Sequence, residues 1–349
     1  MAGVERLVVG LVALATAGAA IADYAGAPAL ATFGLATLAL AGLAWTVSFA
    51  TEQVGGRLGP GATGVLQSTL GNLPEFFVVL FALNAGKTVV AQTSIIGSIF
   101  ANALLVLGLV IVAGVRASDD GVMRFRSRLP MDTATLLLLA VFIIVLVGLS
   151  VGTTDKASHH VKAISIVGAV CLLVVYIAWV VPYLRTDVPQ ELPTEPPRVP
   201  LSTAAALLVA GGVGSAFVSD WFVASLSPSM RRLGLSDAFA GLVVVAIAGN
   251  AVENVAGIVL AAKGKADLAI SVVKNSVAQV AAFLFPVLIL VSLFFATPLT
   301  FSLKPVYIGA LGLTAISVWQ ITGDGESTLF EGFSLVALYV ILATVTLYE

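Results

Sequence analysis

Apolar residues run through this chain in long stretches that short polar segments separate. None of these stretches alternates apolar and polar positions with the period of two that a membrane-barrel strand shows. Because backbone groups find no water inside a bilayer, helices are the spanning structure that fits. The stretches cover residues 7–22, 27–50, 61–85, 88–113, 129–150, 161–184, 201–226, 236–262, 266–296, 305–322 and 328–347. The pattern therefore predicts an all-α polytopic membrane protein with about eleven transmembrane helices.

The composition supports a lipid environment for these helices. Hydrophobic residues make up 59% of the 349 residues and charged residues 10%, and the mean hydropathy is +1.07. That is more apolar surface than a soluble fold of this length buries. The net charge of -2 is spread over the loops and leaves no basic patch for nucleic acid. The bilayer is thus the expected partner, and the oligomeric state stays open.

Basic residues in the predicted loops set the expected orientation. One side of the membrane carries Arg6, Arg57, Arg116, Arg124, Arg126, Arg128, Arg185, Arg198, Lys263 and Lys265. The other side carries the smaller set Lys87, Lys156, Lys162, Arg231, Arg232 and Lys304. Because cytoplasmic loops are richer in Lys and Arg, we expect a cytoplasmic N-terminus and an outward-facing C-terminus, in the plasma (inner) membrane of a prokaryote.

An internal repeat divides the chain. The proline-rich acidic segment RTDVPQELPTEPPRVP at 185–200 is typical of a cytoplasmic linker. On either side of it, GNLPEFFVVLFALNAGKTVVAQ at 71–92 aligns with GNAVENVAGIVLAAKGKADLAI, which begins 178 residues later at Gly249. We therefore expect an extra N-terminal helix in residues 1–24, one five-helix repeat in 25–184 and a second in 201–349.

The repeats are predicted to be inverted. Five is an odd number of spans, so the second copy enters the membrane from the side opposite to the first. Inverted repeats with Gly or Pro interruptions at matching positions are typical of secondary transporters, whose binding site lies near the membrane midplane between the copies.

Two glutamates mark the expected site. Glu75 lies three residues after Asn72, and Glu253 lies three residues after Asn250, so each pair shares a helix face near the middle of its segment. A carboxylate at that depth is costly, and two at matched positions favour a functional role over protonated carboxyls that only bond neighbouring helices. Two carboxylates match the charge of one divalent cation and can return protons when the cation leaves.

Polar residues of the next segment in each repeat extend this site. Ser94, Ser98 and Asn102 recur every four residues, which places them on one helical stripe, and Gly97 beside them permits a local break or a close approach. The second repeat offers Ser276 and Gln279 at matching depth. Hydroxyl and amide oxygens suit a hard cation, and alone each could equally serve to bond two helices.

The two motif regions resemble the signature repeats of the calcium/proton exchanger family, within the calcium/cation antiporter superfamily. The resemblance rests on GNLPEFFVVLFALNAGKTVVAQTSIIGSIFANALLVLGLV and GNAVENVAGIVLAAKGKADLAISVVKNSVAQVAAFLFPVLILVS, and on WTVSFATEQVGGRLG and VSDWFVASL before them. It implies an alternating-access antiporter in which Glu75 and Glu253 bind a cation and protons by turns. It also implies that the long helices carrying Glu52 and Asp220 slide to open each side, although both acids could equally be solvated helix ends.

The chain departs from the family pattern at several positions. The first motif usually reads GNATE, whereas Leu73 and Pro74 stand here, and the proline is expected to free a carbonyl one turn earlier. Asn254 replaces the family's His, which removes a group that titrates near neutral pH. Asn275 precedes Ser276 where the family has Gly.

Lys274 is the largest departure and opens alternatives for the ion. It lies about 12 Å deep in its segment, and beside two carboxylates it would leave a site charge that suits Na⁺ better than Ca²⁺. The leading expectation is Ca²⁺/H⁺ exchange without a cofactor. The alternatives are Na⁺/H⁺ exchange and a transport-inactive, ion-sensing protein. An enzyme is disfavoured because the midplane polar groups pair no nucleophile with a base.

Overall fold

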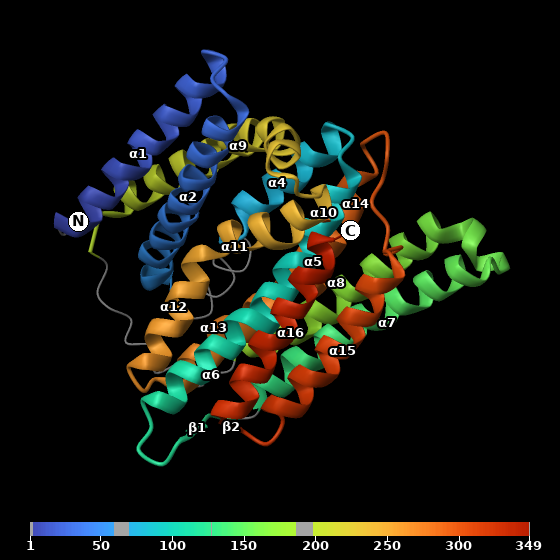
Figure 1. Ribbon diagram of the computed structural model, residues 1–349. Coiled ribbons are helices and arrows are strands. Elements are labelled where there is room, and N and C mark those ends of the chain that lie inside the picture. The colour runs from blue at the N-terminus through green and yellow to red at the C-terminus, as the bar shows by residue number, and fades with distance from the viewer. Residues whose placement is uncertain (1–2, 59–69, 127, 186–197, 349) are drawn as a thin grey trace.

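The computed structural model describes residues 3–58, 70–126, 128–185 and 198–348, and its elements are almost all helices (Figure 1). The segment 186–197 of the predicted linker therefore lies outside the described residues. The first half contains α1 Gly3–Tyr24, α2 Ala29–Leu58, α4 Leu73–Asn84, α5 Thr88–Phe100, the π-helical turn η1 Ala101–Val106, α6 Leu107–Arg116, β1 Val122–Arg124, α7 Arg128–Thr153, the 3-10 turn η2 Lys156–His160 and α8 Val161–Arg185.

The second half repeats this order with the same kinds of interruption. It contains α9 Leu201–Leu233, α10 Asp237–Phe239, η3 Ala240–Val245, α11 Ala246–Gly249, α12 Ala251–Ala262, α13 Ala266–Gln279, η4 Val280–Leu284, α14 Phe285–Ser292, α15 Pro305–Thr322, β2 Glu326–Thr328 and α16 Leu329–Leu347, where η3 and η4 are π-helical. The π-helical turns η1 and η4 begin 179 residues apart, so the two halves share even this local irregularity.

The predicted membrane segments are found in the structure. Among the described residues, nine helices are long and apolar enough to cross a bilayer. A tenth span is the bent pair Asp237–Gly249 and Asn254–Ala262, which meet at 57°. The third predicted segment corresponds to the shorter apolar helix α4, and its residues 61–69 lie outside the described part of the chain. The protein is an all-α integral membrane protein with one extra N-terminal helix and two inverted five-helix repeats.

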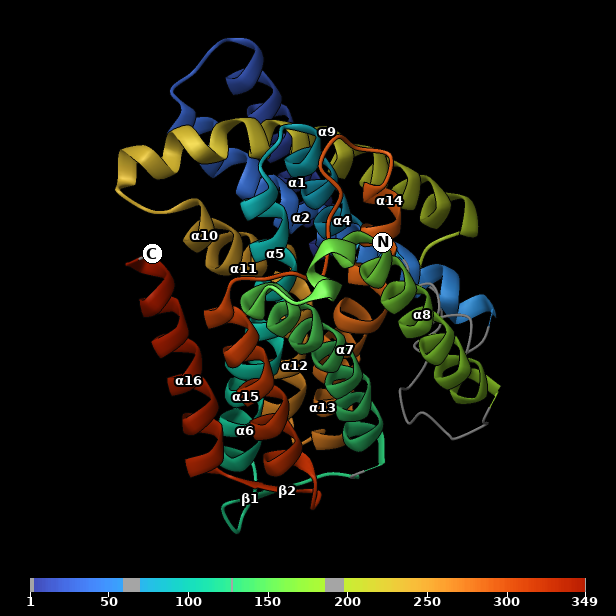
Figure 2. The same cartoon turned by 90° about the vertical axis from the view of Figure 1, so that its right-hand side faces the viewer.

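The helices form two groups. α1, α2 and α9 pack against one another and lie to one side of the other helices in both views (Figures 1 and 2). The second group contains the paired helices α4 with α5 and α12 with α13, and the outer helices α7, α8, α15 and α16. Outer helices expose large apolar side chains such as Phe142, Val167 and Leu313, as lipid-facing surfaces do.

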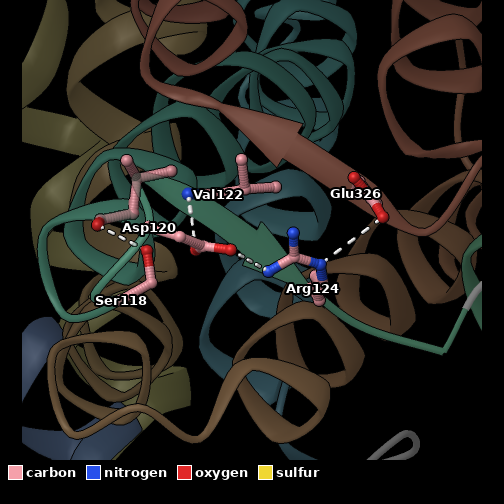
Figure 3. Close-up of polar contacts among 6 residues, drawn as sticks. Ser118, Asp120, Val122, Arg124 and Glu326 are labelled. Carbon is pink, nitrogen blue, oxygen red and sulfur yellow. Dashed lines mark hydrogen bonds and ion pairs between the residues drawn. The ribbon is translucent and has the colours of Figure 1, made fainter.

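Three connections meet at one end of the molecule. The short strands β1 and β2 pair in antiparallel register, with Met123 opposite Ser327, and join the α6–α7 and α15–α16 connections. Arg124 contacts Asp120 at 2.5 Å and Glu326 at 3.5 Å (Figure 3), and its hydrogen bond holds the pKa of Asp120 below the usual value. The backbone N–H of Arg126 donates to Asp267 at the start of α13. The loops after the fourth, eighth and tenth spans thus share one face, as the predicted topology requires.

Candidate cation and proton site

Both halves of the chain break a membrane helix at the same residue. Asn72 precedes α4 with φ −92° and ψ 14°, and Asn250 precedes α12 with φ −106° and ψ 12°. Each asparagine follows a glycine, Gly71 or Gly249. The sequence predicts Gly or Pro interruptions at matched positions but places each asparagine on the helix face of its glutamate, and that placement is wrong, because both asparagines lie just outside the helices. A broken span inside a membrane protein leaves backbone groups free to line a polar cavity.

Glu75 lies in the first turn of α4 and is 1% exposed. The partial positive charge of a helix N-terminus favours a carboxylate there. A small cavity adjoins Glu75, and its walls include Leu40 of α2, Phe222 of α9 and the end of α11 at Ala248 and Gly249. Residues of α2, α9 and α11 thus all line the cavity beside this carboxylate.

Glu253 occupies the matched place in α12, three residues after Asn250. Its side chain lies outside the described part of the structure. A Cβ atom at Gly249 would lie 3.9 Å from the Cβ atom of Glu75, so the second break lies directly against the first glutamate. The backbone therefore brings the two motif regions together as the inverted repeat predicts.

Asn250 connects the second break to α5. Its Nδ2 atom donates to Ser98 Oγ and to the carbonyl oxygen of Ala246, each at 3.0 Å. Both residues of the Asn250–Ser98 pair are buried. These two bonds fix the orientation of the amide group and therefore also the position of its oxygen atom, Oδ1.

A very close approach between α5 and η3 supports this connection. A Cβ atom at Gly97 would lie 2.6 Å from the Cα and carbonyl oxygen of Leu242, and one at Gly241 would lie 2.0 Å from Thr93 Oγ1. Only glycine fits at these distances. The prediction that Gly97 permits a close approach is confirmed, and this contact places Ser98 next to the broken helix.

The site region holds an unusual number of buried polar atoms without a protein partner. At least one such atom belongs to each of Asn72, Asn102, Asn250, Asn254, Asn275 and Ser276, when partners are sought among the described residues. Native structures leave few buried polar atoms unpaired, and each calls for an explanation such as an ion or water. These side chains come from α5–η1, α12 and α13 and from the two breaks, which contact one another. Neutral oxygens near Glu75 and near the break that precedes Glu253 suit the coordination of a hard cation.

Other predicted site residues have different surroundings. Ser94 is buried and donates to the carbonyl oxygen of Val90 at 2.6 Å, a bond within its own helix. Gln279 ends α13 and is partly buried. Glu52 on α2 and Asp220 on α9 are exposed. Their suggested role in gating stays a prediction.

The structure adds one polar residue that the sequence pattern did not single out. Ser219 is buried on α9 and donates to the carbonyl oxygen of Pro74 at 3.4 Å. It adjoins Asp220, whose charge is the more conspicuous feature of the sequence. The apolar run around Ser219 was the available signal, because a buried hydroxyl in a membrane helix needs an acceptor.

Pro74 has a different effect from the one its chemistry suggests. It lies in the first turn of α4, where a backbone N–H has no intrahelical partner to lose. The matched position in α12 is Val252, and the helix breaks at Asn250 with similar angles without a proline. The proline therefore fits a break that already exists in both halves. The expectation that it frees an additional carbonyl has no support in this geometry.

Lys274 also differs from expectation. Its side chain is 1% exposed, which excludes a lipid-facing or solvated position. Its Nζ atom donates to Thr322 Oγ1 on α15 at 3.1 Å, and that hydroxyl donates onward to the carbonyl oxygen of Val318. Lys274 and Ser276 are two residues apart on α13, so they point to nearly opposite sides of the helix. The ammonium is thus held against α15, on the side of α13 opposite to Ser276.

Comparison with known proteins identifies the family. The model of the family described as "Sodium/calcium exchanger protein" matches residues 28–184 and 203–348. The chain belongs to this family. The two matched stretches lie on either side of the predicted linker and leave out α1.

Related proteins of this family cover nearly the whole chain. A Ca²⁺/H⁺ antiporter of Synechocystis sp. is 32% identical over 333 residues, which cover 89% of each chain. The Ca²⁺/H⁺ antiporter ChaA of Bacillus subtilis is 30% identical and covers 90% of this chain and 92% of its own length. The solved structure of native YfkE superposes with a TM-score of 0.82 at 27% identity and covers 98% of this chain and 100% of its own.

Proposed function

We propose that this protein is a Ca²⁺/H⁺ antiporter that uses Glu75 and Glu253 as its exchanging carboxylates. The observation that carries this proposal is the pair of matched helix breaks, each followed after three residues by a glutamate. The names of the relatives support calcium and protons as the substrates. On this account the chain is a transporter and not an enzyme, and it needs no cofactor besides the ions it moves.

The chemistry of exchange follows from the charges at the site. Two carboxylates neutralise one divalent cation, and the amide and hydroxyl oxygens of Asn250, Ser98 and Asn102 complete the coordination. When the cation leaves, two negative charges close together in a medium of low dielectric repel each other strongly. Proton uptake removes this repulsion, so cation and protons occupy the site by turns.

Access to the site is proposed to alternate by movement of α2 and α9. Both helices reach the cavity at Glu75, through Leu40 and Phe222, and with α1 they form a group whose members pack most extensively on one another. A sliding motion of this group can open the site to one face and close it to the other. The proposed orientation is a cytoplasmic N-terminus and an outward C-terminus in a prokaryotic plasma membrane.

Neither alternative suggested by Lys274 is favoured. Monovalent exchange and a locked, ion-sensing site both need the ammonium beside the carboxylates. In the structure the hydrogen bond of the ammonium goes to Thr322 on α15. Relatives from Synechocystis sp., Schizosaccharomyces pombe and Bacillus subtilis carry calcium in their names.

The test is ion-driven proton movement in proteoliposomes that contain the purified full chain and an imposed pH gradient. We expect Ca²⁺ to dissipate the gradient and Na⁺ at the same concentration to leave it largely intact. Lys274→Leu should keep this preference, because the ammonium is held by α15. A gradient that responds to neither ion would overturn the proposal. A wild type that prefers Na⁺, or a variant that shifts strongly toward Ca²⁺, would restore the charge-balance alternative.

A further inference from the structure

The two turns that follow the glutamate helices have the same backbone. Gly86 and Gly264 take left-handed conformations, with φ of 70° and 72°. The next residue is a lysine in both, and Lys87 and Lys265 have φ/ψ of −88°/61° and −90°/63°. Because the repeats are inverted, the turns lie on opposite faces of the membrane. Each face therefore has one lysine at the same place in the same turn.

The surroundings of the two lysines differ. Lys87 is half-buried, and its Nζ atom donates to the backbone carbonyl oxygen of Val223 in α9. Burial lowers the pKa of Lys87, while the nearby carboxylate of Asp237 favours its charged form and Arg231 opposes it. Lys265 is exposed, and its Nζ atom donates to none of the described residues. Of these two matched lysines, Lys87 is thus hydrogen-bonded to α9 on one face, whereas Lys265 on the other face makes no such bond within the described part of the chain.

The carbonyl that Lys87 contacts lies where α9 is perturbed. Pro228 lies inside α9, and a proline ring presses against the carbonyl four residues before it, here Ala224. Helices commonly bend at such positions, and the Val223 carbonyl that Lys87 contacts lies one residue before the Ala224 carbonyl that loses its helical donor. An ammonium on the adjoining turn is a strong donor for such an oxygen.

The helices attached to these turns show the same asymmetry. α4 packs along α9, where Ser219 contacts Pro74, whereas the matched helix α12 touches α2 at few positions. Val255 and Val259 of α12 are 62% and 43% exposed. The matched residues of α4, Phe77 and Phe81, are half-buried. The paired helices are therefore closed onto the α1–α2–α9 group at the Lys87 face and separated from it at the Lys265 face.

We propose that Lys87 and Lys265 are positioning residues that hold the two closed states of the exchange cycle in turn. In the present state Lys87 holds α4 and α5 to a main-chain carbonyl of α9. In the opposite state Lys265 holds α12 and α13 to a main-chain carbonyl of α2, and Lys87 is released. This inference rests on the proposed alternating movement of α2 and α9. It assigns the closing contact on each face to one residue.

The test measures the water accessibility of matched positions in nanodiscs, where both faces are open to reagent. The background is Cys171→Ser, which removes the single cysteine. Phe77→Cys and Val255→Cys then serve as matched probes for a charged maleimide, which reacts only with a hydrated thiol. We expect the probe at 255 to react faster than the probe at 77. A probe at 255 that reacts no faster would overturn the assignment of the open face.

Adding Lys87→Met should raise the rate at position 77 and lower it at position 255, with a change in their ratio of roughly tenfold, as expected for loss of one charge-assisted hydrogen bond. Lys265→Met should shift the ratio the opposite way. Lys87→Arg should restore the wild-type ratio, and Lys162→Met, which removes an exposed lysine, should not change it. An unchanged ratio in Lys87→Met, or equal increases at both probes, would overturn the proposal.

The labelling does not depend on which ion is carried, so it separates this inference from the proposed function. If the wild type exchanges Ca²⁺ for protons and Lys87→Met leaves the ratio unchanged, the positioning role fails alone. If the ratio responds and no exchange occurs, the proposed function fails, and the conformational role of Lys87 stands.

Discussion

The two halves of the molecule are alike at their central breaks and unlike in the packing around them. Helix α4 begins after Asn72 with a proline in its first turn, and α12 begins after Asn250 without one, yet the backbone angles of the two asparagines are similar. Around these breaks, α5 approaches η3 so closely that glycine is required, and α4 packs on α9 more extensively than α12 on α2. The break thus follows from the repeated Gly-Asn motif, whereas the packing of the neighbouring helices differs between the two halves.

Among the substitutions that compare the two halves, Gly97→Ala is expected to have the largest effect on stability and exchange. In Gly97→Ala the new methyl group would lie 2.6 Å from backbone atoms of Leu242, which cannot rotate away. We expect a loss of ~1–3 kcal/mol in stability, the usual cost of overpacking, and a strong loss of exchange because Ser98 moves with the helix. The measurements are the thermal midpoint in detergent and proton flux.

Asn275 occupies the matched place in the second half and provides the control for Gly97. It already carries a side chain, whose Oδ1 has no described partner. Asn275→Ala should therefore change the thermal midpoint little. If both substitutions destabilise the protein equally, the close contact between α5 and η3 is not specific to the first half.

A second contrast is expected between the two break asparagines. Asn250 donates to Ser98 and Ala246, whereas Nδ2 of Asn72 has no acceptor among the described residues. Asn250→Ala should cost about 1–3 kcal/mol, because it leaves buried partners unpaired. Asn72→Ala should cost less. Calcium-driven proton flux should fall more in Asn250→Ala, and a larger loss in Asn72→Ala would show that the stated hydrogen bonds do not decide the difference.

The smallest effect is expected at Pro74. Since Asn250 forms the same break without a proline, Pro74→Ala should leave the break and the exchange in place, with a stability change of ~1 kcal/mol or less from the added freedom of the unfolded chain. Proton flux and the thermal midpoint measure this. Loss of exchange in Pro74→Ala would show that the first half depends on its proline, contrary to the comparison.

Much of the architecture was accessible from the sequence, because lipid restricts the choices. Apolar stretches of about twenty residues predict the helices. The recurrence of Gly-Asn and Glu at a constant spacing predicts the inverted repeat, whereas the placement of Asn72 and Asn250 at breaks came from the structure. The polar stripe on α5 also lies in the predicted region, with Ser98 bonded to the opposite repeat.

Other features depend on packing that a single sequence does not show. The π-helical turn η1 at Ala101–Val106 inserts into the predicted stripe and rotates helix α6 relative to α5, and no residue pattern marks it. The direction of Lys274 is set by the rotation of α13 against α15, where Thr322 supplies a partner. Asp220 is conspicuous by its charge, whereas its neighbour Ser219 makes the contact with α4.

The most direct test of the central claim compares the two glutamates with an exposed acid. Glu75→Gln and Glu253→Gln keep the size of each side chain and remove its charge, and Asp119→Asn removes a carboxylate from an exposed loop. Calcium-driven proton flux in proteoliposomes should fall by more than ~100-fold in each glutamine variant, since even outer partners of a metal site commonly contribute roughly 10–100-fold. It should persist in Asp119→Asn. Exchange at the wild-type rate in either glutamine variant would contradict a two-carboxylate site.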